Sequence, residues 1–192
     1  IALGAGNDKI TFTASLDDAD IVAGGEGTDT LIATSADLLA LTTALAANDN
    51  ISGFEKIEFS DQVAGGSALT VASVQKTGVD TVVLDALGTA GTLVVNFVAG
   101  ANNLVLAGVL GGALTVDAAG SATTDALTIS NTDAAADAFS DENIVSTDFE
   151  TLNIVTSGTG ANTAQAAGNI TMTASTGGTT TVKFSGTNEI AV

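Results

Sequence analysis

The sequence predicts an all-β fold of short strands, and two observations lead to this prediction. Hydrophobic residues make up 45% of the chain, mostly aliphatic and without aromatic bulk, which is enough to bury a core. Short apolar runs recur with glycine-bearing turns between them, at intervals of roughly ten to thirteen residues. This spacing is typical of sandwiches, barrels and solenoids, and does not choose among them. The clearest runs are residues 81–84, 92–98, 104–109, 113–116 and 126–129.

Later runs alternate between apolar and polar residues, which predicts strands with one buried face. In residues 127–130, 170–173 and 182–184 each apolar side chain is followed by Thr, Ser or Lys, or ends the run. We expect the apolar members, Val182 and Phe184 included, to face the core. The run 93–95 is apolar on both faces and predicts a more central strand.

One segment, residues 36–47, predicts a helix instead. Ser35 can cap its start, and three leucines repeat at helical spacing on one face. We expect this face to pack on the β-structure; it consists of Leu38, Leu41 and Leu45. A weaker helical candidate covers residues 134–139.

The residue types that are absent argue against catalysis. The chain has no His, Cys, Pro, Trp, Tyr or Arg, and its four basic residues are all lysines. General acid–base and nucleophilic catalysis usually rely on several of these types, so we expect that the protein is not an enzyme. Glu55, Glu58 and Asp61 flank one predicted strand, and a carboxylate pair can serve a glycosidase. With seven Phe as the only aromatics to bind sugar, we favour a solvated strand face.

The net charge of −18, from 22 acidic and 4 basic residues, limits the partners that the protein can bind. Nucleic-acid binding needs clustered Lys and Arg, and an anionic membrane would repel this chain. Self-repulsion of this size destabilises a compact state unless cations neutralise it. Oxygen ligands without His or Cys suit hard cations such as calcium. No apolar run approaches the ~18–20 residues of a membrane span.

The most informative motif lies in residues 24–32, Gly-Gly-Glu-Gly-Thr-Asp-Thr-Leu-Ile. It is a full match to the calcium-binding β-roll nonapeptide G-G-x-G-x-D-x-U-x, and residues 4–10 match the second half of that pattern. Glycines allow a tight turn that aims carbonyls inward, and the Asp adds an anionic oxygen. Because calcium takes six to eight oxygens, two turns must stack to share one ion.

We therefore expect a calcium site within residues 4–29, with a pair of ordinary Gly/Asp turns as the alternative. The candidate metal ligands are Gly4, Gly6, Asn7, Asp8, Asp18, Asp20, Gly25, Gly27 and Asp29. The later turn at residues 120–125 has Thr123 where the motif has its inner glycine. We expect that site to be lost or weak.

An internal echo predicts two modules. Residues 24–31 are followed by Phe54-Glu55, and the similar residues 120–127 are followed by Phe149-Glu150, at separations of 96 residues for Asp and 95 for Phe. We expect a calcium-binding β-rich module at 1–115 and a second, degenerate β-rich module at 116–192, with coincidence in a low-diversity sequence as the alternative.

Residues 4–59 carry a family resemblance. The order Gly-x-Gly-Asn-Asp-x-Ile, an insert of roughly twenty residues, Gly-Gly-x-Gly-Thr-Asp-Thr-Leu and then Phe-Glu-x-Ile resembles RTX-type bacterial surface-layer (S-layer) proteins. The resemblance implies a right-handed parallel β-solenoid, type I secretion, folding outside the cell when calcium binds, and a calcium-driven lattice on the cell surface. The tandem nonapeptide array of RTX toxins is missing, which favours the S-layer type.

These observations predict a structural segment of a calcium-dependent bacterial surface layer that self-associates. Two alternatives remain, an adhesin that binds a surface such as a cell-surface polysaccharide, and a folding and secretion module of a larger secreted RTX protein. The chain begins within a motif, so we expect it to be a fragment of a longer protein.

Overall fold

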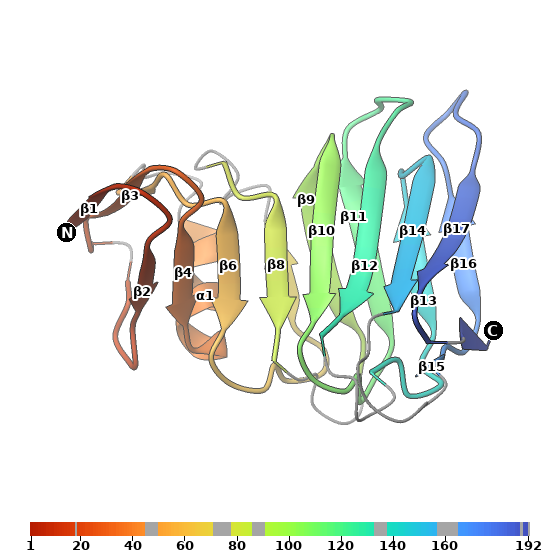
Figure 1. Ribbon diagram of the computed structural model, residues 1–192, viewed down its shortest axis with the longest axis horizontal. Coiled ribbons are helices and arrows are strands. Elements are labelled where there is room, and N and C mark those ends of the chain that lie inside the picture. The colour runs from red at the N-terminus through yellow and green to blue at the C-terminus, as the bar shows by residue number, and fades with distance from the viewer. Residues whose placement is uncertain are drawn as a thin grey trace.

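The chain forms a parallel β-solenoid with one short helix, as Figure 1 shows for the computed structural model. The structure describes residues 1–17, 19–44, 50–70, 78–85, 91–132, 138–156, 165–188 and 190–191. All pairings between its strands are parallel, and each coil places its strand beside that of the coil before. The prediction of a solenoid with short strands is therefore confirmed.

The largest sheet runs the length of the solenoid and has eight strands. In spatial order they are β2 (Lys9–Thr11), β4 (Thr30–Ala33), β6 (Lys56–Phe59), β8 (Thr81–Leu84), β10 (Ala101–Leu106), β12 (Ala126–Asn131), β14 (Thr151–Thr156) and β17 (Thr181–Gly186).

Smaller sheets form the other sides. The five-stranded sheet contains β7 (Ala68–Thr70), β9 (Leu93–Val98), β11 (Leu114–Ala119), β13 (Ile144–Thr147) and β16 (Ile170–Thr173). At the N-terminal end a three-stranded sheet contains β1 (Ala2–Ala5), β3 (Val22–Glu26) and β5 (Ile51–Ser52). Near the C-terminus β15 (Gln165–Ala166) pairs with β18 (Ile190–Ala191).

A ladder of apolar side chains holds the coils together. The strand register aligns one inward position from every strand of the large sheet, and six of its eight members are at most 1% exposed. Burying one such side chain contributes about 1.5–3 kcal/mol, so the stacked column is a major source of stability. Its members are Ile10, Leu31, Ile57, Val82, Leu104, Ile129, Ile154 and Phe184.

The outward residues directly before this ladder are polar, and the register aligns them too. The amide of Asn103 donates to the hydroxyl of Thr81 at 3.4 Å, and that of Asn153 to Thr128 at 3.3 Å. This outer column begins and ends with a lysine. Its members are Lys9, Thr30, Lys56, Thr81, Asn103, Thr128, Asn153 and Lys183.

The coils of the C-terminal half are longer by one pleat. Strands β10, β12, β14 and β17 have six residues, whereas β2, β4, β6 and β8 have three or four. The register aligns Thr81 with Asn103, so β10 begins two residues earlier than β8 does. The longer strands extend further toward the end at which the strands start (Figure 1).

The predicted helix is confirmed, with a different cap. Helix α1 covers Ser35–Ala44, and residues 45–49 lie outside the described part of the chain, Leu45 included. The hydroxyl of Thr34, not of Ser35, accepts the N–H of Asp37 at 3.2 Å, the geometry of an N-cap. Leu38 and Leu41 are buried, and α1 packs against β7.

One burial prediction is wrong at the C-terminal end. Val182 and Phe184 alternate with Lys183 as expected, but they are 39% and 46% exposed. Strand β17 is the last strand of the large sheet, so no further coil covers its inner side chains. A cavity of about 350 Å³ opens beside them, lined also by Gly168, Asn169 and Ile170.

Other predictions fall partly outside the described residues or stay open. Of the weaker helical candidate at 134–139, residues 134–137 lie outside the described part, and Phe139 is fully buried. The core is continuous across residue 115, where the sequence places the module boundary, and this residue lies inside β11. No described helix has the length and apolarity needed to span a membrane.

Candidate cation site

Glycines of neighbouring coils stack on one another at the N-terminal turns. Gly4 pairs with Gly25, and both have positive φ angles, +109° and +119°. A Cβ on Gly25 would lie 1.8 Å from the carbonyl oxygen of Gly4, and one on Gly27 would lie 1.9 Å from that of Gly6. The motif therefore needs glycine here for two reasons, the backbone conformation and the close approach of the next coil.

The aspartates of these turns link one coil to the next. The Oδ1 atom of Asp29 accepts the N–H of Asp8 at 2.7 Å, and the N–H of Asp29 donates to Oε2 of Glu55 at 2.7 Å. One coil earlier, Oδ1 of Asn7 accepts the N–H of Thr28 at 2.9 Å. Side-chain carboxylates and a carboxamide thus join three successive coils, because they accept hydrogen bonds from backbone N–H groups at the turns.

Asp29 is fully buried, and its second oxygen has no partner. Among the described residues, Oδ2 of Asp29 and Oδ2 of Asp8 are buried atoms without a hydrogen bond. A buried, ionised carboxylate with an unsatisfied oxygen is costly, so each such atom needs an explanation. A cation bound at the turn is one that fits, because the surrounding donors are carboxylate, carboxamide and backbone carbonyl oxygens.

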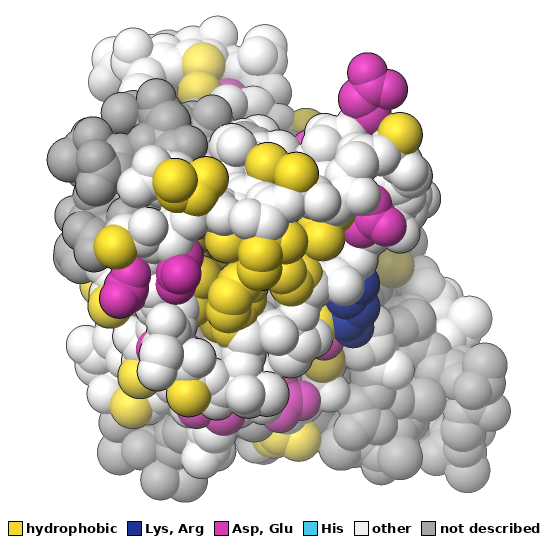
Figure 2. Space-filling model, turned by 90° about the vertical axis from the view of Figure 1, so that its left-hand side faces the viewer, with side chains coloured by type: hydrophobic (Ala, Val, Ile, Leu, Met, Phe, Trp, Pro, Cys, Tyr) yellow, Lys and Arg dark blue, Asp and Glu magenta, His cyan; other side chains and the backbone are white. Residues whose placement is uncertain are grey.

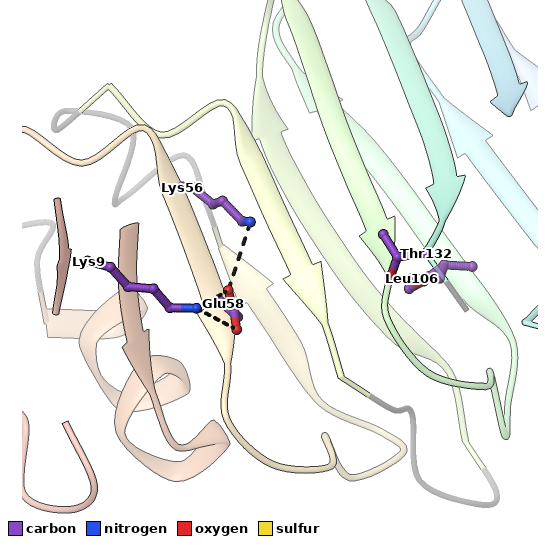
Figure 3. A network of polar contacts seen from close by, with 5 residues as sticks. All are labelled: Lys9, Lys56, Glu58, Leu106 and Thr132. Atoms are coloured by element: carbon purple, nitrogen blue, oxygen red, sulfur yellow. Dashed lines mark hydrogen bonds and ion pairs between the residues drawn. The ribbon is translucent and has the colours of Figure 1, made fainter. Parts of the chain in front are cut away.

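The described lysines do not neutralise these carboxylates. Lys9 and Lys56 both point to Glu58 on the outer face of the large sheet, at 3.5 and 3.8 Å (Figure 3). Lys183 lies on β17 at the opposite end of the solenoid, and Lys76 lies outside the described residues. These three side chains therefore supply no positive charge to the buried turn.

The structure brings together most, but not all, of the predicted ligands. Gly4, Gly6, Asn7 and Asp8 form the turn of one coil, and Gly25, Gly27 and Asp29 form the turn stacked on it. Asp20 precedes β3, whereas the glycine turn follows it, and its carboxylate accepts the N–H of Asp17 at 3.1 Å. Asp18 lies outside the described residues.

The carboxylates form a ladder rather than a cluster. Within the described part of the chain, no three Asp or Glu side chains converge on one point. Six of the eight strands of the large sheet directly follow an acidic residue, namely Asp8, Asp29, Glu55, Asp80, Asp125 or Glu150. A cation at this position would take its remaining ligands from backbone carbonyls and water, as calcium commonly does.

Glu55 is the member that sequence reasoning missed. In sequence it is one of three acids that flank a strand, but in the structure the three have separate partners. Glu55 accepts the Asp29 N–H, Glu58 pairs with lysines, and Asp61 accepts the N–H of Ser35 at 2.5 Å. The available signal was the internal echo, which places a Glu directly after a buried Phe in both halves.

A separate acidic pair lies on the five-stranded sheet. Asp117 on β11 pairs in register with Thr147, the residue before Asp148. Burial, and next the charge of Asp148, raise the pKa of Asp117 above its ordinary value. This pair adds to the unfavourable negative charge of the fold, although Asp117 is only partly buried.

Comparisons with known proteins add no identity. No family model, curated protein or solved structure matches this chain. Function must therefore be argued from the motif, the fold and the turn geometry.

Proposed function

We propose that this chain is a structural segment of a calcium-dependent bacterial surface layer, folding and assembling outside the cell when calcium binds. The observation that carries the proposal is the buried carboxylate of Asp29, whose Oδ2, like Oδ2 of Asp8, has no hydrogen-bond partner among the described residues. The stacked glycine turns and the solenoid fold are compatible with the resemblance to RTX-type S-layer proteins.

Calcium acts in this proposal by offsetting repulsion that otherwise opposes folding. The chain carries 22 acidic and 4 basic residues, so the compact state concentrates negative charge. A ligand that binds only the folded state stabilises it in proportion to its saturation. At a concentration ten times the dissociation constant, each site contributes about 1.4 kcal/mol. In a calcium-poor cytoplasm the same chain stays loose enough for secretion.

Calcium is expected to raise the melting temperature. For a domain of this size, about 1.4 kcal/mol per site corresponds to a rise of roughly 3–6 °C. The measurement is differential scanning calorimetry in millimolar calcium and in excess chelator, with magnesium at the same ionic strength as control. Equal melting temperatures in calcium and in chelator would falsify the calcium dependence.

The variant Asp29→Asn locates the effect. It removes the charge of the buried carboxylate and keeps its shape, so the calcium-induced shift should shrink. Glu26→Gln is the matched control, because Glu26 lies in the same turn with an exposed side chain. If both variants keep the wild-type shift, the cation does not bind at Asp29.

Both ends of the described solenoid expose apolar side chains, which a second copy of the chain or further coils of a longer chain would cover. Figure 2 looks at the N-terminal end and shows apolar side chains gathered at its centre. At this end Leu3, Ile10 and Phe12 are only partly buried. At the other end Val182 and Phe184 are exposed beside the cavity described above. Among the described residues, β2 and β17 are the two edge strands of the large sheet.

The outer column of the sheet opposes growth through these edges. If β17 of one copy paired with β2 of the next in the register of the sheet, Lys183 would lie directly beside Lys9. Like charges opposite each other destabilise a strand pair, and edge lysines commonly protect sheets from aggregation. Assembly of a lattice therefore needs more than unrestricted end-to-end stacking.

The variant Lys183→Glu is expected to increase end-to-end association. It converts the repulsion with Lys9 into attraction, while the position is exposed and tolerates the change. Sedimentation velocity over a concentration series should show larger species for this variant, and added salt should reduce them. The neutral variant Lys183→Gln should give a smaller increase. If Lys183→Glu sediments as wild type at every concentration, the sheet edges do not mediate association.

A further inference from the structure

Two buried carboxylates in the C-terminal half repeat the geometry of the first site. Asp125 precedes β12 and is 2% exposed, and Glu150 precedes β14 and is 5% exposed. They lie 96 and 95 residues after Asp29 and Glu55. The turn sequence predicts a lost or weak site here, because Thr123 replaces the inner glycine, so the structural repetition is unexpected.

The hydrogen bonds of the two arrangements correspond one to one. Oδ1 of Asp125 accepts the N–H of Gly100 at 2.7 Å, as Oδ1 of Asp29 accepts that of Asp8 at 2.7 Å. The N–H of Asp125 donates to Oε2 of Glu150 at 2.8 Å, as that of Asp29 donates to Glu55 at 2.7 Å. In both aspartates Oδ2 is buried without a partner among the described residues.

Glu150 holds this arrangement in place. Its Oε2 atom binds the N–H of Asp125, and its Oε1 atom accepts the N–H of Ser175 from the following coil at 3.0 Å. Both oxygens are thus engaged, and the side chain also lies tightly against Gly178, where a Cβ would meet Oε1 at 2.5 Å. Glu150 is therefore a positioning residue, and the oxygen left for a ligand is Oδ2 of Asp125.

In the second arrangement Gly100 of the coil before takes the position that Asp8 has in the first. Gly100, whose N–H binds Asp125, has a φ of +134° that other residues rarely adopt. The strand register also explains why the site is hard to recognise. Because the coils are one pleat longer here, Asp125 lies two positions earlier along its strand than Asp29 does relative to the apolar ladder.

We propose that Oδ2 of Asp125 is a ligand of a second cation site, which takes a hard divalent ion of the calcium class. Two adjacent buried carboxylates with no described lysine in contact are unfavourable, and a cation offsets that cost. The remaining ligands are backbone carbonyls and water. This inference rests on the proposed calcium dependence and extends it to the C-terminal half, where each site would stabilise its own coils.

Isothermal titration with calcium tests the proposal on the wild type, Asp29→Asn, Asp125→Asn and the control Glu26→Gln. We expect each Asp variant to lose one equivalent of bound calcium relative to wild type and to the control. The affinity of the remaining site should stay within about twofold, because distant sites act additively. If Asp125→Asn binds as many ions as wild type while Asp29→Asn loses one, the second site is overturned and the proposed function stands. If the wild type binds no calcium, both are overturned.

A measurement on the wild type covers the case in which Asp125→Asn does not fold. Mn²⁺ is a paramagnetic substitute for calcium that broadens the NMR signals of nearby amides. We expect substoichiometric Mn²⁺ to broaden Gly100 and Asp125 as well as Asp8 and Asp29, with excess calcium restoring all four signals. Broadening confined to Asp8 and Asp29 overturns the second site.

Discussion

Replacing Gly25 by alanine is expected to destabilise the protein by about 2–6 kcal/mol. The backbone φ of +119° is strained for any residue with a Cβ, and that Cβ would lie 1.8 Å from the carbonyl oxygen of Gly4. The obstacle is backbone of the neighbouring coil, which cannot move without breaking the pairing of β1 with β3. The loss should appear as a lower midpoint of urea unfolding, followed by circular dichroism at fixed calcium.

Gly4→Ala is the matched control. Gly4 has nearly the same backbone conformation, with a φ of +109°, but a Cβ there would meet nothing within 4 Å. Gly4→Ala should therefore lower the free energy of unfolding only by the conformational strain, about 1–3 kcal/mol. An equal loss in the two variants would mean that the coils do not approach as closely as the structure shows.

Replacing Phe149 by alanine is expected to lower the free energy of unfolding by about 3–5 kcal/mol, the range for removing a buried aromatic side chain. Phe149 is fully buried directly before Glu150, and its equivalent in the first half, Phe54, is 1% exposed. Thermal unfolding with calcium present should show the loss. Because Phe149 anchors the chain next to Glu150, the variant should also weaken calcium binding in the C-terminal half.

Phe184→Ala makes the same chemical change at the uncovered end. Phe184 is 46% exposed, so the substitution should change the free energy of unfolding by no more than about 0.5 kcal/mol, as for most surface substitutions. A large loss for Phe184→Ala would indicate that another copy of the chain covers this end under the conditions used. Repeating the measurement at several protein concentrations distinguishes the two cases.

The acidic ladder changes how the calcium hypothesis is understood. The sequence motif indicates the aspartates, but in the structure a glutamate of the next coil accepts the hydrogen bond from each aspartate N–H. Glu55 and Glu150 each accept the N–H of the preceding aspartate, and so they hold the turn whose other carboxylate oxygen remains open. The proposed calcium binding would therefore be coupled to coil stacking through the same few atoms.

The sequence by itself determined the class of fold and the nature of the first turn. Regular apolar runs and glycine turns are local patterns, so they predict strands, a helix over 36–47 and stacked turns at residues 4–8 and 25–29. The glycines at 25 and 27 were identified from the nonapeptide pattern, which requires glycine in its tight turn. These features need no knowledge of distant residues.

Only the tertiary structure decided which residues meet across coils. Val182 and Phe184 have a buried pattern but lie on the last strand, so they are exposed. Asp20 is close to the motif in sequence yet lies at the other end of β3. Asp125 lies one pleat away from the position that Asp29 takes, and Glu150 links it to Ser175 on the next coil. Strand register and coil length set these contacts, and neither is encoded in a short motif.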